Sequence, residues 1–289
     1  MSLTQTQRAQ ESWTVGSREL VIPTVLGRIN VRIGGEADGP AMVFWPSLLM
    51  NGSMWRFQYE HYAPTHRVIL VDAPGIGKSD PLTRTITLEE CSDCLIEILD
   101  ALGIERCLFV GNSWGAMLAS VFAAWHPERL LGAVAANGTA TPATFLERMK
   151  MGPLIGLIGL QSKVPKWLVA AGQSNFGGPT AEKTKPAFLE FFRCILLENP
   201  KSIAFQMKSI LLGRKDNHAL LRTIKGIPLL VLAGEEDRQF SLPIAKSFAD
   251  AIPGSTFVIM PKTAHLSPRE SPELFNETVD AFIKSRVSL

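Results

Sequence analysis

The sequence lacks a strong charge bias, since its 289 residues carry 29 basic and 27 acidic side chains and a formal net charge of +2. Nucleic-acid-binding chains normally have a much larger basic excess, so we expect no nucleic-acid partner. Long apolar runs are also missing. The longest, Gly152 to Leu160, is far too short to cross a bilayer, and we expect no membrane partner. The opening stretch MSLTQTQRAQESW has no apolar core like that of a signal peptide, which predicts a cytoplasmic protein.

Cysteine is scarce, and two of the four residues form a C-x-x-C motif at Cys91 and Cys94. No second pair lies at the spacing of a zinc site. Cys91 instead falls on an apolar helical stripe formed by Leu88, Cys91, Leu95, Ile98 and Leu102, which favours free, buried thiols. We therefore predict no metal site and no cofactor, and a chain of this length can build a core without them.

Apolar runs of strand length recur along the chain and define the expected fold. They are Val68–Val71, Cys107–Val110, Gly132–Ala136, Leu229–Ala233 and Thr256–Met260. Because these runs show no polar alternation, they predict strands covered on both faces, as in a parallel sheet. Helical patterns lie between them, including Thr87–Leu102, which opens with a capping box, and Pro272–Ile283. We predict an α/β fold with a doubly wound, mainly parallel sheet, preceded by short antiparallel strands around Leu20–Ile22 and Ile29–Ile33.

The alternation of strands and helices lapses between residues 138 and 225, where helix-like stretches broken by prolines take over. We predict a helical cap over residues 138–225, inserted into a core formed by residues 1–137 and 226–289. Its apolar stretches, FLERMKMGPLIGLIGL and AFLEFFRCILL, are compatible with plain helix packing or with covering a pocket. The oligomeric state is left open, and a homo-oligomer is compatible with the sequence.

Charge is divided unevenly between these two parts. The cap carries thirteen basic and five acidic residues, a net charge of +8, which leaves −6 for the remainder. Two interpretations stay open. The basic residues lie on solvated helix faces, or some of them line a pocket and attract a carboxylate-bearing small-molecule substrate.

The stretch FVGNSWGAML places Ser113 between Gly111 and Gly115, after an apolar run and before an apolar helical pattern. This G-x-S-x-G spacing is typical of a nucleophile elbow, where a serine occupies a strained turn from strand to helix. Side chains at the glycine positions would collide with the neighbouring strand and helix. Helix capping is the alternative role for the serine, but capping does not require the glycines. We predict Ser113 as a nucleophile.

A serine hydroxyl needs an adjacent base that is itself oriented by a third group. Five histidines are available: His61, His66, His126, His218 and His265. Only His265 follows a predicted strand and precedes a helix, at the carboxyl end of the sheet where open α/β folds gather their chemistry. We predict His265 as the catalytic base.

The orienting acid is expected beyond another strand, between the nucleophile and the base in chain order. The run GEED offers Glu235, Glu236 and Asp237 directly after a predicted strand. The loop after the preceding strand offers Asn137 and no acid. We predict Asp237 as the third member of the triad.

Two backbone N–H groups are expected to stabilise a developing oxyanion, because preorganised donors serve best there. One donor is the N–H of Trp114, the residue after the nucleophile. The second should come from WPSLLMNGSMW, the loop after the early strand Met42–Phe44. We predict Leu48 for this role, with Leu49 next to it.

With these residues assembled, nearly the whole chain resembles a bacterial small-molecule α/β-hydrolase. The marks are DAPGIGKSD, similar to the family's D-x-x-G-x-G-x-S turn, the elbow GNSWG, the segment HPERL, the GEED run and His265. SLLMNGSMW resembles the oxyanion loop of 3-oxoadipate enol-lactonases and supports Leu48 as a donor. GNS is similar to meta-cleavage C–C hydrolases, and SWG to proline iminopeptidases. Haloalkane dehalogenases and soluble epoxide hydrolases resemble the fold but have aspartate at the position of Ser113.

The resemblance implies hydrolysis of a small carboxylic ester or lactone through an acyl-enzyme on Ser113, without a cofactor. Two alternatives remain open. One is a C–C bond hydrolase or lyase on the same scaffold, in which His265 moves a proton and the serine has a different part. The other is a ligand sensor that retains the triad but turns over slowly.

Overall fold

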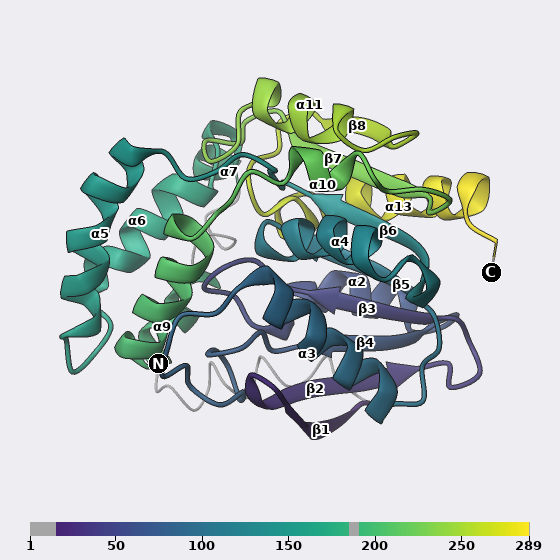
Figure 1. Ribbon diagram of the computed structural model, residues 1–289, viewed down its shortest axis with the longest axis horizontal. Helices are drawn as coiled ribbons and strands as arrows, with labels where there is room; N and C mark the ends of the chain where they lie inside the picture. The colour runs from purple at the N-terminus through teal and green to yellow at the C-terminus, as the bar shows by residue number, and fades with distance from the viewer. Residues whose placement is uncertain (1–15, 185–190, 289) are drawn as a thin grey trace.

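A computed structural model of the protein describes residues 16–184 and 191–288. The opening stretch MSLTQTQRAQESW and the first four residues of AFLEFFRCILL, both used above, lie outside the described residues. Eight strands form one sheet in the order β1-β2-β4-β3-β5-β6-β7-β8 (Figure 1). The β1–β2 and β2–β4 pairs are antiparallel, and the other pairs are parallel. The predicted α/β fold with a mainly parallel sheet is confirmed.

The strands coincide with the apolar runs of the sequence, and the central ones are buried along their whole length. Their bounds are β1 Arg18–Thr24, β2 Gly27–Gly35, β3 Ala41–Trp45, β4 Arg67–Val71, β5 Cys107–Asn112, β6 Leu130–Ala136, β7 Leu229–Gly234 and β8 Thr256–Met260. Burial on both faces explains why the central strands β3, β5 and β7 contain hardly any polar side chains.

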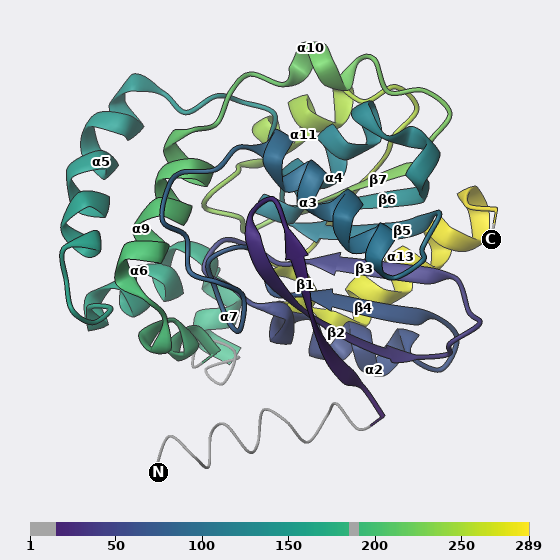
Figure 2. The same ribbon diagram turned by 60° about the horizontal axis from the view of Figure 1, so that its bottom comes forward.

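Helices cover both faces of the sheet, α3 and α4 on one side and α2 and α13 on the other (Figures 1 and 2). Their bounds are η1 Gly52–Trp55, α2 Arg56–Tyr62, α3 Leu88–Ala101, α4 Trp114–Trp125, η2 Pro127–Arg129, α11 Leu242–Asp250, α12 Ser267–Glu270 and α13 Pro272–Arg286. Helix α3 begins with the predicted capping box, in which Thr87 and Glu90 each accept from the other's backbone N–H. Its apolar stripe is buried and includes Cys91, which is a free thiol like Cys94.

A group of helices lies between β6 and β7, in the region expected to form the cap. They are α5 Phe145–Gly159, α6 Lys166–Phe176, α7 Pro179–Thr184, η3 Phe191–Leu197, α9 Pro200–Met207, the π-helical turn η4 Lys208–Leu212 and α10 His218–Leu221. Helices α5, α6 and α9 lie side by side at one end of the molecule, whereas α10 lies beside α4 (Figures 1 and 2). Within the described ranges, no helix combines the length and the apolar character needed to cross a bilayer.

Hydrogen bonds tie α9 to the core loop that follows β4. The Ser202 hydroxyl donates to the carbonyl oxygen of Gly75 at 2.7 Å and accepts from the N–H of Leu82 at 2.8 Å. The Gln206 amide donates to the carbonyl oxygen of Pro74 at 2.9 Å. These buried bonds fix α9 above the carboxyl end of the sheet, because breaking any of them would leave a buried polar group without a partner.

Candidate active site

Ser113 lies at the sharp turn between β5 and α4, with φ 55° and ψ −104°. This backbone conformation is uncommon for a residue other than glycine and is held here by close packing. A Cβ atom at Gly111 would lie 2.0 Å from the carbonyl oxygen of Gly115, and a Cβ at Gly115 would lie 2.3 Å from the carbonyl oxygen of Trp45. The two glycines therefore allow α4 to start directly against β3 and β5.

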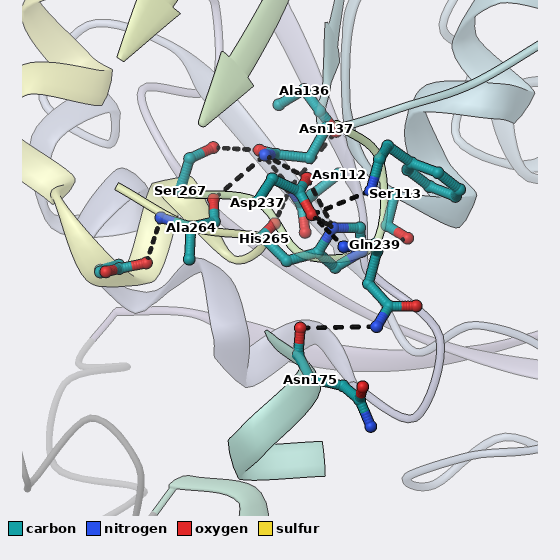
Figure 3. A network of polar contacts seen from close by, with 12 residues as sticks. Asn112, Ser113, Ala136, Asn137, Asn175, Asp237, Gln239, Ala264, His265 and Ser267 are labelled. Atoms are coloured by element: carbon teal, nitrogen blue, oxygen red, sulfur yellow. Dashed lines mark hydrogen bonds and ion pairs between the residues drawn. The ribbon is translucent and has the colours of Figure 1, made fainter. Parts of the chain in front are cut away.

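Ser113, His265 and Asp237 form one hydrogen-bonded row at the carboxyl end of the sheet (Figure 3). His265 Nε2 lies 2.8 Å from Ser113 Oγ, and His265 Nδ1 lies 2.9 Å from Asp237 Oδ2. A carboxylate only accepts hydrogen bonds, so Nδ1 carries the proton and Nε2 is the acceptor for the serine hydroxyl. This is the tautomer that a general base requires.

The Asp237 carboxylate is held by donors on both oxygens. Oδ1 accepts from the N–H groups of Gln239, at 2.8 Å, and Phe240, at 3.1 Å, while Oδ2 accepts from the Asn137 amide at 2.9 Å. Burial raises the pKa of Asp237, but its electrostatic interaction and hydrogen bond with His265, together with these hydrogen bonds, outweigh burial and keep the pKa below its ordinary value. The carboxylate is thus ionised at neutral pH and available to orient the imidazole.

The other two carboxylates of the GEED run face different partners. Glu235 Oε2 accepts from the N–H of Lys262 at 2.9 Å. Glu236 accepts from the N–H and the hydroxyl of Thr180, which belongs to α7. Of the three adjacent acids, only Asp237 reaches the imidazole, and Glu236 instead joins the helical segment to the core.

Asn137, set aside above because it is not an acid, lies in the centre of the polar network (Figure 3). Its amide donates to Asp237 and, at 3.1 Å, to the carbonyl oxygen of Ala264, while its oxygen accepts from the Ser267 hydroxyl at 2.7 Å. Asn112 adds a bond from its amide to the carbonyl oxygen of His265 at 3.1 Å. The sequence contained a signal for Asn137, because asparagine tolerates the left-handed conformation that the residue adopts here, with φ 55°.

The predicted oxyanion loop leaves the sheet beside the elbow, because Trp45 of β3 pairs in register with Gly111 of β5. Leu49 adopts φ 67°, and its N–H donates to Gln206 Oε1 at 3.3 Å. Within the part of the chain that the structure describes, no protein acceptor takes the N–H of Leu48. Of the two neighbouring donors, Leu48 is therefore the one open to a ligand.

The D-x-x-G-x-G-x-S turn, which begins at Asp72, is hydrogen-bonded to this loop. Asp72 accepts from the N–H groups of Gly52, at 2.8 Å, and Lys78, at 3.0 Å, and from the Asn30 amide at 3.0 Å. Burial raises the pKa of Asp72 above its ordinary value, although the same hydrogen bonds act in the opposite direction. The bond to Gly52 joins the turn after β4 to the end of the oxyanion loop.

The remaining histidines lie elsewhere. His61 pairs with Asp280 on the surface at 2.8 Å, and His126 lies 3.6 Å from Glu128. His66 is packed against the aromatic ring of Tyr62, and burial lowers its pKa.

His218 forms a second row of serine, histidine and acid, with Asp216 at 2.7 Å and Ser247 at 3.1 Å. Ser247 is exposed in the middle of α11, so its hydroxyl lacks the strained turn and the helix N-terminus that an elbow supplies.

A cavity of about 400 Å³ lies between the oxyanion loop and the helices of residues 138–225. Leu48 and Leu49 of the oxyanion loop line it together with Gln239, which binds Asp237, and with residues of α5, α6 and η4, among them Phe176 at the end of α6. The Phe176 ring stacks on the imidazole of His265, with ring centres 5.0 Å apart and planes at 15°. The charged residues of the lining are Glu147, Lys150 and Arg214, and most of the others are apolar.

No group of three metal-ligating side chains occurs in residues 16–184 and 191–288.

A sheet in this order, with a serine elbow after β5 and a histidine after β8, defines the class of α/β hydrolases. A model of the alpha/beta hydrolase family matches residues 42–278, so the chain belongs to that family. Its relatives and structural neighbours include lactonases and esterases, and the chain is a hydrolase.

Three relatives show the range of the similarity. The chain is 27% identical to 3-oxoadipate enol-lactonase 2 of Acinetobacter baylyi, over 89% of this chain and 93% of that protein. It is 30% identical to the 2-hydroxy-6-oxononadienedioate/2-hydroxy-6-oxononatrienedioate hydrolase of Paraburkholderia phymatum, over 75% and 76%. The crystal structure of the enol-lactonase from Burkholderia xenovorans matches with a TM-score of 0.83 and 23% identity, over 92% of this chain and all of that one.

Proposed function

We propose that this protein hydrolyses a small-molecule carboxylic ester or lactone through an acyl-enzyme on Ser113. The observation that carries the proposal is the continuous row from Ser113 Oγ to His265 and on to Asp237, with contacts of 2.8 and 2.9 Å. The likeness to relatives named 3-oxoadipate enol-lactonase supports the choice of an ester or lactone bond. Residues 138–225 act as the cap that closes the substrate cavity.

In this mechanism His265 Nε2 removes the hydroxyl proton while Ser113 Oγ attacks the substrate carbonyl. The N–H groups of Leu48 and Trp114 receive the oxyanion, and losing one such donor costs about 3 to 4 kcal/mol in comparable sites. The imidazolium then gives its proton to the leaving alkoxide. A water, deprotonated by His265, attacks the acyl carbon; the bond from that carbon to Ser113 Oγ breaks, Oγ takes the proton back from the imidazolium, and the acid is released. Asp237 fixes the imidazole tautomer and stabilises its charged form throughout.

The test is a panel of aryl esters, enol lactones and ring-cleavage diketones assayed with the wild type and Ser113→Ala. We expect ester or lactone turnover, reduced by about a thousandfold or more in the variant. Ser120→Ala is the matched control, since Ser120 is a buried serine of α4, the helix that follows Ser113, and its hydroxyl donates to the carbonyl oxygen of Met117 at 2.8 Å.

Mass spectrometry of the wild type mixed with a slow aryl carbamate should detect an adduct on Ser113. Unchanged turnover in Ser113→Ala, or cleavage of the diketones alone, would overturn the proposal. Tight ligand binding with negligible steady-state turnover would point to a sensor instead.

A further inference from the structure

Arg214 is a buried cation in the wall of the substrate cavity. It follows η4, lines the cavity, and keeps only 10% of its side chain exposed. Its Nη2 donates to Glu147 Oε1 at 3.1 Å, but Nε is buried and has no hydrogen-bond partner among residues 16–184 and 191–288. A buried donor without an acceptor is costly, and such a group in a cavity wall points to a ligand that supplies the acceptor.

Arg214 also lies at a distance that a small substrate can span. Its guanidinium packs over the ring of Phe240, which contacts the imidazole of His265 edge-on. The guanidinium carbon lies 5.6 Å from the centre of the Phe240 ring, and that centre lies 5.5 Å from the centre of the imidazole. The guanidinium carbon of Arg214 is therefore no more than roughly 11 Å from the centre of the His265 ring. A molecule with a few bonds between two polar groups can therefore reach both residues.

Glu147 occupies only part of the guanidinium. Its other oxygen, Oε2, accepts from the N–H and the hydroxyl of Thr144 in the capping box of α5, so the carboxylate is held in place at that helix start. Of the five N–H groups of Arg214, one serves Glu147. Those that remain include Nε, which belongs to the fork with which arginine binds carboxylates through two bonds. Lys150 adds a second cation, so the charged lining has a net charge of +1.

We propose that Arg214 binds the free carboxylate of an acidic ester or lactone whose scissile carbonyl lies at Ser113. This assignment rests on the function proposed above and narrows it to anionic substrates. It also favours the second interpretation of the basic cap, because Arg214 binds the carboxylate and Lys150 adds positive charge in the same cavity wall. A purely structural tie between Arg214 and α5 would affect all substrates alike.

The experiment compares a 4-nitrophenyl monoester of glutaric acid with its methyl diester, which has the same leaving group and no free carboxylate. For Arg214→Met we expect kcat/KM on the acid to fall by about 30-fold or more, and on the methyl diester to change by less than about threefold. Arg214→Lys keeps the charge without the fork and should retain part of the preference. Arg222→Met, at an exposed arginine of the same region, should leave both substrates unchanged.

Glu147→Gln tests the proposal even if Arg214 variants fail to fold. Removing the competing carboxylate should lower KM for the acidic monoester by several-fold and leave the methyl diester unaffected. Equal losses on both substrates in Arg214→Met, or a Glu147→Gln enzyme with unchanged preference, would overturn the assignment while leaving the ester-hydrolase proposal intact. Turnover of both esters by Ser113→Ala would instead overturn the proposed function.

Discussion

Replacing Asn137 by glycine tests whether the polar network behind the triad positions Asp237. Glycine is the right replacement because Asn137 has φ 55°, a conformation that glycine adopts freely. Alanine at this position would add about 1 kcal/mol of backbone strain to the loss of the side chain. The pair Asn137→Gly and Asn137→Ala therefore separates the hydrogen bonds from the backbone conformation.

The expected size of the effect follows from the bonds that disappear. The amide donates to the Asp237 carboxylate at 2.9 Å and to the carbonyl oxygen of Ala264 at 3.1 Å, and its oxygen accepts from Ser267 at 2.7 Å and from the Asn112 amide at 3.3 Å. The bond to the ionised group is worth about 1.5 to 3 kcal/mol and each of the three neutral bonds about 1 kcal/mol, so the free energy of unfolding should fall by about 4.5 to 6 kcal/mol. Loss of the donor raises the folded-state pKa of Asp237.

The assay combines urea unfolding with kcat measured on an aryl ester between pH 4 and 8. A raised pKa of Asp237 means that the carboxylate is protonated at a higher pH, so the part of the acid limb that reflects loss of this carboxylate moves to higher pH. At the plateau, kcat should fall by about tenfold, because the imidazole is oriented less well. Ser267→Ala is the control that removes one of the two donors to the Asn137 oxygen and leaves the bond to Asp237 in place. It should cost about 1 kcal/mol and leave the pH profile unchanged.

Two results would refute this reasoning. One is an Asn137→Gly enzyme with the rate and the acid limb of the wild type. The other is a Ser267→Ala enzyme whose pH profile moves as far as that of Asn137→Gly, since Ser267 has no contact with the carboxylate.

Three further predictions follow from the same geometry. Asp237→Asn should lower kcat by about a thousandfold and Glu236→Gln by less than about threefold, and equal effects would contradict the choice of acid. Gly115→Ala places a Cβ 2.3 Å from a strand carbonyl oxygen, so it should lose about 1 to 3 kcal/mol in thermal unfolding, while Gly156→Ala, with open space around it, should not. Burial raises the pKa of Glu198 to about 7. Between pH 4.5 and 7 the folded state therefore binds more protons than the unfolded chain, and the free energy of unfolding falls as pH rises, by about 3 kcal/mol at most. Urea midpoints of Glu198→Gln should lack this slope, and a slope equal to that of the wild type would refute the assignment.

The sequence predicted the strands, the mainly parallel sheet and the elbow, because each depends on residues close together in the chain. An unbroken apolar run such as Leu229–Ala233 is stable only where both faces are covered, and that requirement can be read from the run itself. The two glycines around Ser113 likewise report a local crowding of backbone atoms. The order of Ser113, Asp237 and His265 along the chain, each directly after a predicted strand, likewise predicted the triad.

Only the tertiary structure decided which of several equivalent residues meet. Glu235, Glu236 and Asp237 are neighbours in sequence, yet their side chains reach Lys262, Thr180 and His265, and no local pattern separates them. The same holds for Asn137, whose partners Asp237, Ala264 and Ser267 lie a hundred or more residues away, and for Arg214, one of thirteen basic residues between positions 138 and 225. Periodicity and backbone conformation are set by a few adjacent residues, whereas contacts across the end of a sheet are set by strand order and by how the helices above it pack.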